Sequence, residues 1–397
     1  MGLNDTPSSE RLHIGFFGCR NAGKSSLVNA VTDQNLSVVS DVKGTTTDPV
    51  KKAMELLPLG PVLIIDTPGY DDEGTLGEKR VNSTKRVLKS CDIAVLVSEA
   101  GRELNEAENE LVGLFKQRDI PFIIVKNKTD ISDSPAVNKE NIIYTSALNK
   151  TGIEKLKNAI GASDKDKTKT VNYVGDLINP DDIVVLVTPI DSAAPKGRMI
   201  LPQQQAIRDI LDFGAISVVT KETQLFETLK SLSKSPALVV TDSQVFKKVN
   251  KIVPNEIPLT SFSILMARYK GFLNSAVQGV KAIDSLKDGS KVLISEGCTH
   301  HRQCDDIGTV KMPKWLKDYT GADLHFEWSS GTGFPENLKD YDLVIHCGGC
   351  MLNDNEMKYR MTVAQKQGVP FTNYGTAIAH MQGILKRSLA PIPDIDF

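Results

Sequence analysis

The sequence predicts an α/β protein of three domains, each built on a mostly parallel β-sheet. Its 397 residues correspond to about two or three domains of ordinary size. Short apolar runs alternate with helix-like stretches over residues 12–160 and again from residue 172 onward, the order expected of parallel sheets with crossover helices. A polar, charged stretch at Ser163–Thr170 predicts a linker. We therefore expect domains at residues 1–165, 172–268 and 269–397.

The first domain contains five apolar runs of strand length. They predict strands at Leu12–Phe17, Val62–Asp66, Ile93–Val97, Phe122–Lys126 and Ile142–Thr145. The polar and apolar pattern between these runs predicts helices at Lys24–Asp33 and Glu103–Gln117.

The two later domains repeat the alternation on a smaller scale. Strands are expected at Ile183–Val187, Ile216–Thr220, Ala237–Thr241, Val292–Ser295, Leu324–Trp328, Leu343–His346 and Pro370–Thr372. Helices are expected at Pro202–Phe213, Glu222–Ser233, Ser243–Val249, Ser261–Leu286, Lys311–Tyr319, Asn355–Gln367 and Gly375–Ser388. A long apolar stripe of helical spacing supports the helix at Ser261–Leu286.

Charge and hydropathy limit the classes of partner. There are 47 basic and 49 acidic residues, a net charge of −2, which argues against nucleic acid as the main ligand. No apolar run approaches the roughly 20 residues that span a bilayer, and the first ten residues lack the layout of a signal peptide. We expect a cytoplasmic protein, in which the six cysteines are more often metal ligands than disulfides.

A phosphate-binding loop lies between the first predicted strand and helix. Residues 18–25 read Gly-Cys-Arg-Asn-Ala-Gly-Lys-Ser and fit the pattern G-x-x-x-x-G-K-[ST]. Gly18 and Gly23 allow a tight turn whose backbone N–H groups face phosphates, Lys24 supplies a positive charge, and Ser25 binds Mg²⁺. The sequence therefore predicts a nucleotide site in a doubly wound P-loop fold. We include Asn21, Ala22 and Ser26 among its binding residues.

Three later segments indicate GTP as the nucleotide. Asp66 and Gly69 end a predicted strand, where Asp66 would hold a water on Mg²⁺ and the Gly69 N–H would contact the γ-phosphate. Asn127, Lys128 and Asp130 follow a later strand, and a carboxylate at Asp130 accepts both N–H groups of the guanine edge. Further along, Ser146 and Ala147 would offer a backbone N–H to the guanine O6.

Together with residues 44–48, Gly-Thr-Thr-Thr-Asp, these motifs resemble the GTPases of the tRNA-modification and Era-like branch. The resemblance implies that Thr46 closes over Mg²⁺ and that Asn21 helps to hold a potassium ion. It assigns catalytic roles to Lys24, Thr46, Asn21 and Gly69. Ras-type enzymes carry a glutamine after the last glycine of the Asp-x-x-Gly element, whereas this chain has Tyr70.

Cysteine and histidine residues are concentrated near the C-terminus. Cys298 and His300 follow one predicted strand, and His346, Cys347 and Cys350 follow another. The carboxyl ends of neighbouring parallel strands form the usual ligand crevice, so we expect the two groups to meet there. The donor set suits zinc or an iron–sulfur cluster equally well. Three thiolates and one weaker donor suit a 4Fe-4S cluster with an exchangeable fourth position.

That fourth ligand is open among His346, His300 and Glu296. With a GTPase domain, a middle domain and this terminal arrangement, the whole chain resembles the HydF family of FeFe-hydrogenase maturation GTPases. The resemblance implies a 4Fe-4S cluster on Cys298, Cys347 and Cys350, and homodimerisation through the middle domain. It also implies a scaffold that receives a binuclear iron precursor made with radical-SAM maturases and delivers it to apo-hydrogenase.

The sequence is also compatible with two other functions. One is a GTPase of tRNA modification or ribosome assembly with a structural zinc site, against which the neutral charge counts. The other is a metal-sensing regulator that binds GTP.

Overall fold

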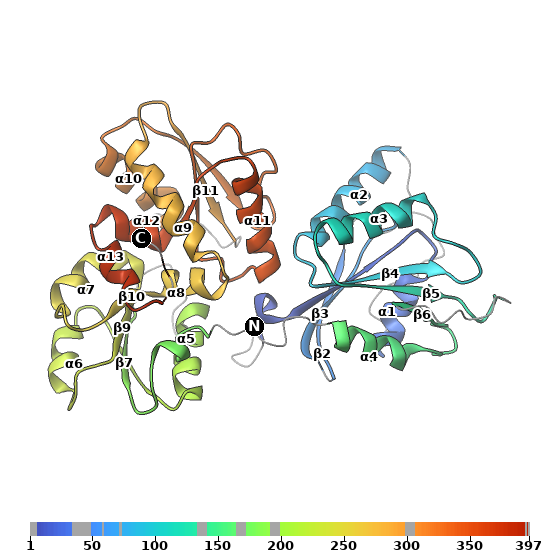
Figure 1. Ribbon diagram of the computed structural model, residues 1–397, viewed down its shortest axis with the longest axis horizontal. Helices are drawn as coiled ribbons and strands as arrows, with labels where there is room; N and C mark the ends of the chain where they lie inside the picture. Colours follow the sequence, from blue (N-terminus) through green and yellow to red (C-terminus); the bar gives the residue numbers. More distant parts are fainter. Residues whose placement is uncertain are drawn as a thin grey trace. The chain divides into compact units, whose positions relative to one another are not determined.

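A computed structural model describes residues 6–33, 49–57, 59–70, 74–132, 141–163, 172–190, 199–297, 306–393 and 395. The chain divides into two compact units, residues 1–168 and 169–397, each considered by itself (Figure 1). Over the described parts of the chain, no helix is long and apolar enough to cross a membrane.

The first unit is a six-stranded sheet in the order β2-β3-β1-β4-β5-β6, parallel except for β2. Its strands are β1 Leu12–Phe17, β2 Val50–Leu56, β3 Gly60–Asp66, β4 Ile93–Glu99, β5 Phe122–Asn127 and β6 Ile142–Tyr144. Its helices are α1 Lys24–Thr32, α2 Gly74–Leu88, α3 Glu106–Gln117 and α4 Ile153–Ser163.

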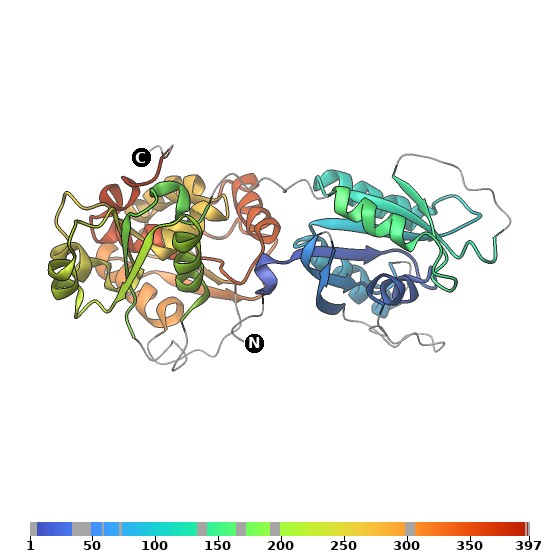
Figure 2. The ribbon, with the colours of Figure 1, turned by 90° about the horizontal axis from the view of Figure 1, so that it is seen from below.

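Two separate apolar cores show that this sheet is covered on both faces. Leu27 of α1 and Leu156 of α4 belong to one core, while Leu88 of α2 and Phe115 of α3 belong to the other. Figure 1 shows α2 and α3 on one side of the strands and α1 and α4 on the other, and Figure 2 views the unit from the side of α1 and α4. The predicted doubly wound fold is therefore confirmed.

The second unit holds two four-stranded parallel sheets, in the orders β10-β9-β7-β8 and β12-β11-β13-β14. The strands are β7 Ile183–Val187, β8 Ile216–Thr220, β9 Leu238–Thr241, β10 Leu259–Ser261, β11 Lys291–Glu296, β12 His325–Ser330, β13 Leu343–His346 and β14 Phe371–Asn373. The helices are α5 Leu201–Asp212, α6 Leu225–Ser231, α7 Phe246–Ile252, α8 Phe262–Tyr269, α9 Leu273–Gly279, α10 Met312–Thr320, α11 Asp354–Lys366, α12 Tyr374–Met381 and α13 Leu385–Leu389. One continuous apolar core runs through both sheets, which joins them into a single compact unit.

For two helices of this unit the predicted length is wrong, because each is interrupted. The helix expected at Ser261–Leu286 ends at Tyr269, and the chain resumes as α9 at Leu273. Gly271 between them has φ +75°, a left-handed conformation that interrupts a right-handed helix. The helix expected at Gly375–Ser388 is broken in the same way by Gly383. The apolar spacing continues across each break because both flanking helices face the same core.

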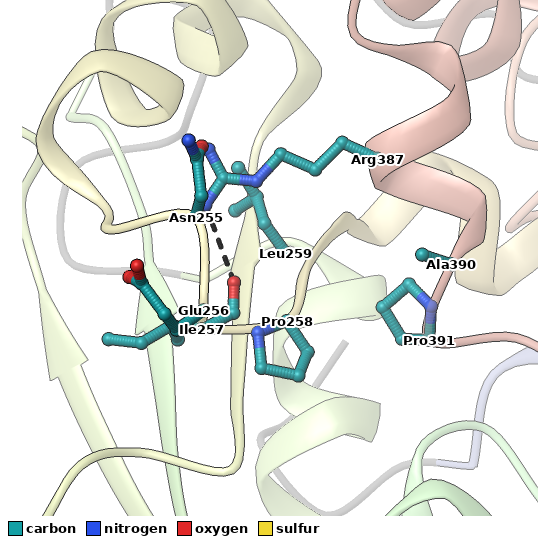
Figure 3. Close-up of a pocket in the computed structure, with 8 residues that line it drawn as sticks. All are labelled: Asn255, Glu256, Ile257, Pro258, Leu259, Arg387, Ala390 and Pro391. Atoms are coloured by element: carbon teal, nitrogen blue, oxygen red, sulfur yellow. Dashed lines mark hydrogen bonds between the residues drawn. The ribbon is translucent and has the colours of Figure 1, made fainter.

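Arg387 of α13 fastens the C-terminal helices to the segment before β10. Its guanidinium donates to Asn250 Oδ1 at 2.7 Å and to the Val253 carbonyl at 3.0 Å. Figure 3 shows this side chain in a small pocket lined by residues 255–259 and by Ala390 and Pro391. The hydrogen bonds to main-chain carbonyls make this pocket a structural junction between the two sheets.

Candidate functional site

The phosphate-binding loop joins β1 to α1 in a conformation that requires its two glycines. Gly18 has φ +141°, and an added Cβ would lie 2.1 Å from the Val97 carbonyl oxygen. Gly23 has φ +86°, and its Cβ would lie 2.4 Å from Asn127 Nδ2. Asn21 also has a positive φ, which asparagine tolerates better than most residues. The loop backbone therefore folds tightly against both the central strand β4 and the guanine-binding segment.

The groups expected to contact phosphate and Mg²⁺ lie together at the carboxyl end of the sheet. Lys24 Nζ lies inside the loop and donates to the Gly18 and Cys19 carbonyls at 3.0 and 2.7 Å. Ser25 Oγ donates to Asp66 Oδ2 at 2.6 Å, which brings two of the expected magnesium-site residues into contact. Thr46 lies outside the described residues.

The segments expected to bind guanine form hydrogen bonds with the phosphate-binding loop and with each other. Asn127 Nδ2 donates to the Ala22 carbonyl at 3.2 Å, and Asn127 Oδ1 accepts from the Ala147 N–H at 3.1 Å. Ser146 Oγ donates to Asp130 Oδ1, which orients that carboxylate. Lys128 forms an ion pair with Glu99 at the end of β4. These contacts hold the segments of Asn127, Asp130 and Ser146 together beside the phosphate loop.

Tyr70 stands at the sequence position of the Ras-type glutamine but does not take over the role of that side chain. Its side chain is 4% exposed, and its hydroxyl donates to Glu110 Oε1 on α3 at 2.7 Å. Burial and the neighbouring Glu110 raise the pKa of Tyr70, so the phenol stays protonated. Tyr70 therefore anchors the segment after Gly69 to α3 and is not oriented to activate water. Gly69 packs closely against the phosphate loop, because an added Cβ would lie 3.1 Å from the Arg20 backbone nitrogen.

A second site lies where β11 and β13 end side by side in the second unit. Ser295 of β11 pairs with His346 of β13, and the Cys347 N–H donates to the Ser295 carbonyl at 2.8 Å. This pairing brings Glu296 next to the Cys347–Cys350 segment. Cys298 and His300 lie outside the described residues.

Backbone N–H groups are directed at one cysteine sulfur. Cys347 Sγ accepts from the Gly297 N–H at 3.1 Å and from the Gly349 N–H at 3.4 Å. Hydrogen bonds of this kind stabilise a thiolate and are typical of sulfur ligands in iron–sulfur proteins. Burial acts in the opposite direction and raises the pKa of Cys347 and, to about 12, that of Cys350. The two cysteines are therefore better suited to bind a metal centre than to remain as free thiolates.

The cysteine donors within the described ranges do not by themselves complete a metal site. Among these residues, no three histidine, cysteine or carboxylate side chains gather around one point. The chemistry of the donor set nevertheless fits an iron–sulfur cluster, because both thiols follow one strand end and N–H groups face one of the sulfurs.

The two described candidates for the fourth ligand have different surroundings. Glu296 is 6% exposed, and its Oε1 accepts from the Tyr374 hydroxyl at 3.1 Å. His346 is fully buried, with Nδ1 2.8 Å from the Cys347 carbonyl oxygen and Nε2 3.0 Å from an Arg360 nitrogen. Burial and the Arg360 charge lower the pKa of His346 to about 3. The neutral ring therefore donates from Nδ1 and accepts at Nε2.

Sequence reasoning missed two buried cations beside the cysteines. Lys270, in the turn between α8 and α9, is fully buried and lies 3.2 Å from Asp354 Oδ1, and its charge lowers the pKa of Cys350. Arg360 of α11 is fully buried and pairs with Glu356 at 3.0 Å. The spacing of Glu356 and Arg360 is typical of a surface ion pair on a helix, so it gave no signal of a buried site.

Comparisons with known protein families match three segments of the chain. Residues 13–128 match the 50S ribosome-binding GTPase family. Residues 173–271 match the hydrogen maturase F dimerization domain, and residues 274–391 match the hydrogen maturase F tetramerization domain. The tRNA modification GTPase MnmE of Clostridioides difficile is 33% identical over 196 residues, which are 46% of this chain and 40% of that protein. GTPase Der of Wolinella succinogenes is 38% identical over 132 residues, covering 32% of this chain and 27% of Der.

Solved structures are more distant. Era in complex with MgGDPNP and a 16S ribosomal RNA segment is 17% identical, with a TM-score of 0.36, over 56% of this chain and 98% of Era. The G domain of the T. maritima FeoB iron transporter is 18% identical, with a TM-score of 0.30, over 39% of this chain and 99% of that domain.

The phosphate loop, the Ser25–Asp66 contact and the oriented Asp130 carboxylate define the first unit as a P-loop GTPase domain. The expectation of a GTP-hydrolysing enzyme is thereby confirmed. The two hydrogen maturase F domains together cover more than half of the chain, and the chain belongs to the hydrogen maturase F (HydF) family. It spans less than half the length of the MnmE and Der proteins it matches.

Asp130→Asn is expected to lower the preference for guanine nucleotides and favour xanthine nucleotides, because the amide reverses the hydrogen-bond demand at one edge of the base. Loss of a charged hydrogen bond worth about 1.5–3 kcal/mol corresponds to a loss of GTP affinity of about 10- to 100-fold. Competition between GTP and XTP measures the change, with Asp119→Asn in an exposed turn as the control. Equal affinity of the unaltered chain for ATP and GTP would contradict the assignment of Asp130.

Proposed function

We propose that the chain is a GTP-hydrolysing scaffold for the maturation of FeFe-hydrogenase. It binds a 4Fe-4S cluster through Cys298, Cys347 and Cys350 and delivers a binuclear iron precursor, made with radical-SAM maturases, to the apo-hydrogenase. The observation that carries the proposal is the pair of N–H groups directed at Cys347 Sγ, in a chain of the hydrogen maturase F family. The precursor is cargo, distinct from the resident cluster.

Each part of the second site has a separate task in this proposal. The bound cluster would supply an iron atom with a replaceable ligand. The Gly297 and Gly349 N–H groups hold one thiolate, and the buried Lys270 charge favours the thiolate form of Cys350. Both effects offset the burial that otherwise keeps these thiols protonated.

The surroundings favour Glu296 over His346 as the exchangeable fourth ligand. Both ring nitrogens of His346 have hydrogen-bonding partners, the Cys347 carbonyl and the Arg360 guanidinium. A carboxylate oxygen is also a harder donor than a thiolate and exchanges more readily at iron. His300 remains a third candidate outside the described residues.

GTP hydrolysis in the first unit times association with partners and their release. Lys24 and the Gly69 N–H contact the β- and γ-phosphates, while Ser25 and Thr46 hold Mg²⁺. Tyr70 is buried against Glu110 and does not orient the attacking water, and the charge on the transferred phosphate needs a cation to stabilise it. We assign that role to a potassium ion held in part by Asn21.

Replacing sodium by potassium at constant ionic strength is expected to raise the GTP hydrolysis rate of the full chain. A cation beside the phosphates would stabilise the charge that develops in the transition state. Phosphate release measured in the two salts gives the ratio, and Asn21→Ala is expected to lower it. Tyr70→Phe serves as the control and should keep the ratio. Equal rates in the two salts would reject the potassium site.

Alanine at Cys298, Cys347 or Cys350 is expected to abolish or strongly destabilise the cluster, because two remaining thiolates leave the iron atoms incompletely bound. Iron and acid-labile sulfide per chain, measured after anaerobic reconstitution, report the loss. Cys91→Ala removes a fully buried cysteine of the first unit and should leave both contents unchanged. GTP binding should persist in all four variants.

The same assay tests a second candidate, a GTPase of tRNA modification with a structural zinc site, which the similarity to MnmE favours. Stoichiometric zinc without sulfide in the reconstituted chain would support that function and refute the scaffold.

We further propose that two copies of the chain pair through residues 172–268. Strand β8 is an edge strand of its sheet, and it exposes the apolar side chains of Ile216 and Val219, which are 49% and 45% exposed. An edge strand with apolar side chains is a ready site for pairing with another chain. The similarity of residues 173–271 to a dimerization domain supports a second copy as that partner.

Ile216→Lys is therefore expected to shift the full chain from dimer or higher oligomer to monomer, because a buried lysine at the interface lacks a counter-charge. Light scattering gives the mass. Leu57→Lys alters an 83% exposed leucine of the first unit and should leave the mass unchanged. A monomeric wild-type chain at micromolar concentration would remove this proposal.

A further inference from the structure

A fully buried arginine lies behind the cysteine segment. Arg360 Nε donates to Glu356 Oε1 at 3.0 Å, and its two terminal nitrogens contact His346 Nε2 at 3.0 Å and the Gly331 carbonyl. The same guanidinium lies 5.1 Å from the centroid of the Phe334 ring. Contacts from its own helix, from the end of β13 and from the segment after β12 fix the guanidinium in one position.

The contact with His346 determines how the imidazole is used. A guanidinium donates hydrogen bonds and cannot accept them, so His346 Nε2 must be the accepting nitrogen. The proton then resides on Nδ1, which donates to the Cys347 carbonyl at 2.8 Å. A metal-binding histidine commonly donates one ring N–H to a carbonyl in this way while its other nitrogen binds the metal. In this chain the Arg360 guanidinium occupies the position at Nε2 that a metal ion takes in such sites.

The backbone of Cys347 is consequently held at both ends. Its N–H donates to the Ser295 carbonyl at 2.8 Å, and its carbonyl accepts from His346. Ser295 Oγ also lies 3.5 Å from an Arg360 nitrogen. Arg360 thus contacts both β11, through Ser295, and β13, through His346.

We propose that Arg360 is a positioning residue for the cluster. It holds His346 as a clamp on the Cys347 carbonyl and thereby keeps the imidazole away from the exchangeable iron. This inference rests on the proposed function, since it concerns the cluster on Cys298, Cys347 and Cys350. Arg360 acts by fixing His346 and contacts neither the cluster nor its cargo.

The test compares the wild type with Arg360→Met/Glu356→Gln, a double variant that leaves no unpaired carboxylate in the interior. Glu356→Gln alone and Arg360→Lys are the controls, because the first keeps the guanidinium and the second keeps a donor. Each chain is labelled with ¹⁵N-histidine, reconstituted with iron and sulfide, reduced, and measured by pulsed electron paramagnetic resonance. Thermal melting of the cluster-free chains checks that the second unit is folded.

The wild type and both controls are expected to show no histidine hyperfine coupling that His346→Gln removes. The double variant is expected to gain one, because the Nε2 lone pair is then free to bind iron, and His346→Gln in that background should remove it. A coupling in the wild type that His346→Gln removes, or its absence from the double variant, would overturn the proposal.

A second measurement does not need the cluster. In the cluster-free labelled chain, the ¹⁵N resonance of His346 Nε2 is expected to shift in the double variant and to shift little in Arg360→Lys. An unchanged resonance in the double variant, in a chain that does assemble a cluster, would refute this inference alone. A wild-type chain that assembles no cluster would refute the proposed function, and this inference with it.

Discussion

The parallel pairing of β11 with β13 is the constraint on which the second site depends. Because Ser295 pairs with His346, Glu296 at the end of β11 and Cys347 just after β13 lie at the same edge of the sheet. The Cys347 N–H continues the ladder by one further hydrogen bond to the Ser295 carbonyl. A shift of register by one residue would turn these side chains to the opposite face and separate them.

The nucleotide site uses the same principle in the first unit. Its phosphate loop follows β1, Asp66 ends β3 and Asn127 ends β5, so its polar groups gather at the carboxyl ends of parallel strands. The chain thus combines a nucleotide site and a cysteine site that each depend on sheet order. Each also has buried cations: Lys24 inside the phosphate loop of one unit, and Lys270 and Arg360 beside the cysteines of the other.

Most of the sheet architecture was predictable, because buried parallel strands are continuous apolar runs. Strand β2 was missed because it is an antiparallel edge with an exposed, charged sequence, Val50–Leu56. The break at Gly271 was missed because an apolar stripe reports which face is buried and does not report whether the backbone is continuous.

The motif residues of both sites were also identifiable from sequence, since the chemistry requires particular residue types at particular spacings. The roles of His346 and Tyr70 were not. Each depends on a partner distant in sequence, Arg360 for the histidine and Glu110 for the tyrosine, and no local pattern connects them. In the protein interior, where water does not compete, a single hydrogen-bonding partner determines how a polar side chain is used. Which polar side chains are buried depends on the tertiary fold, so a local sequence pattern does not show it.

The central claim is that three cysteines hold an iron–sulfur cluster at the β11–β13 edge while His346 remains bound to Arg360. A crystal structure of the anaerobically reconstituted full chain, with anomalous data at the iron and zinc edges, tests it most directly. The account predicts a four-iron peak bonded to Cys298, Cys347 and Cys350, with His346 Nε2 still in contact with the guanidinium. A single zinc peak ligated by these cysteines and His346 would contradict it.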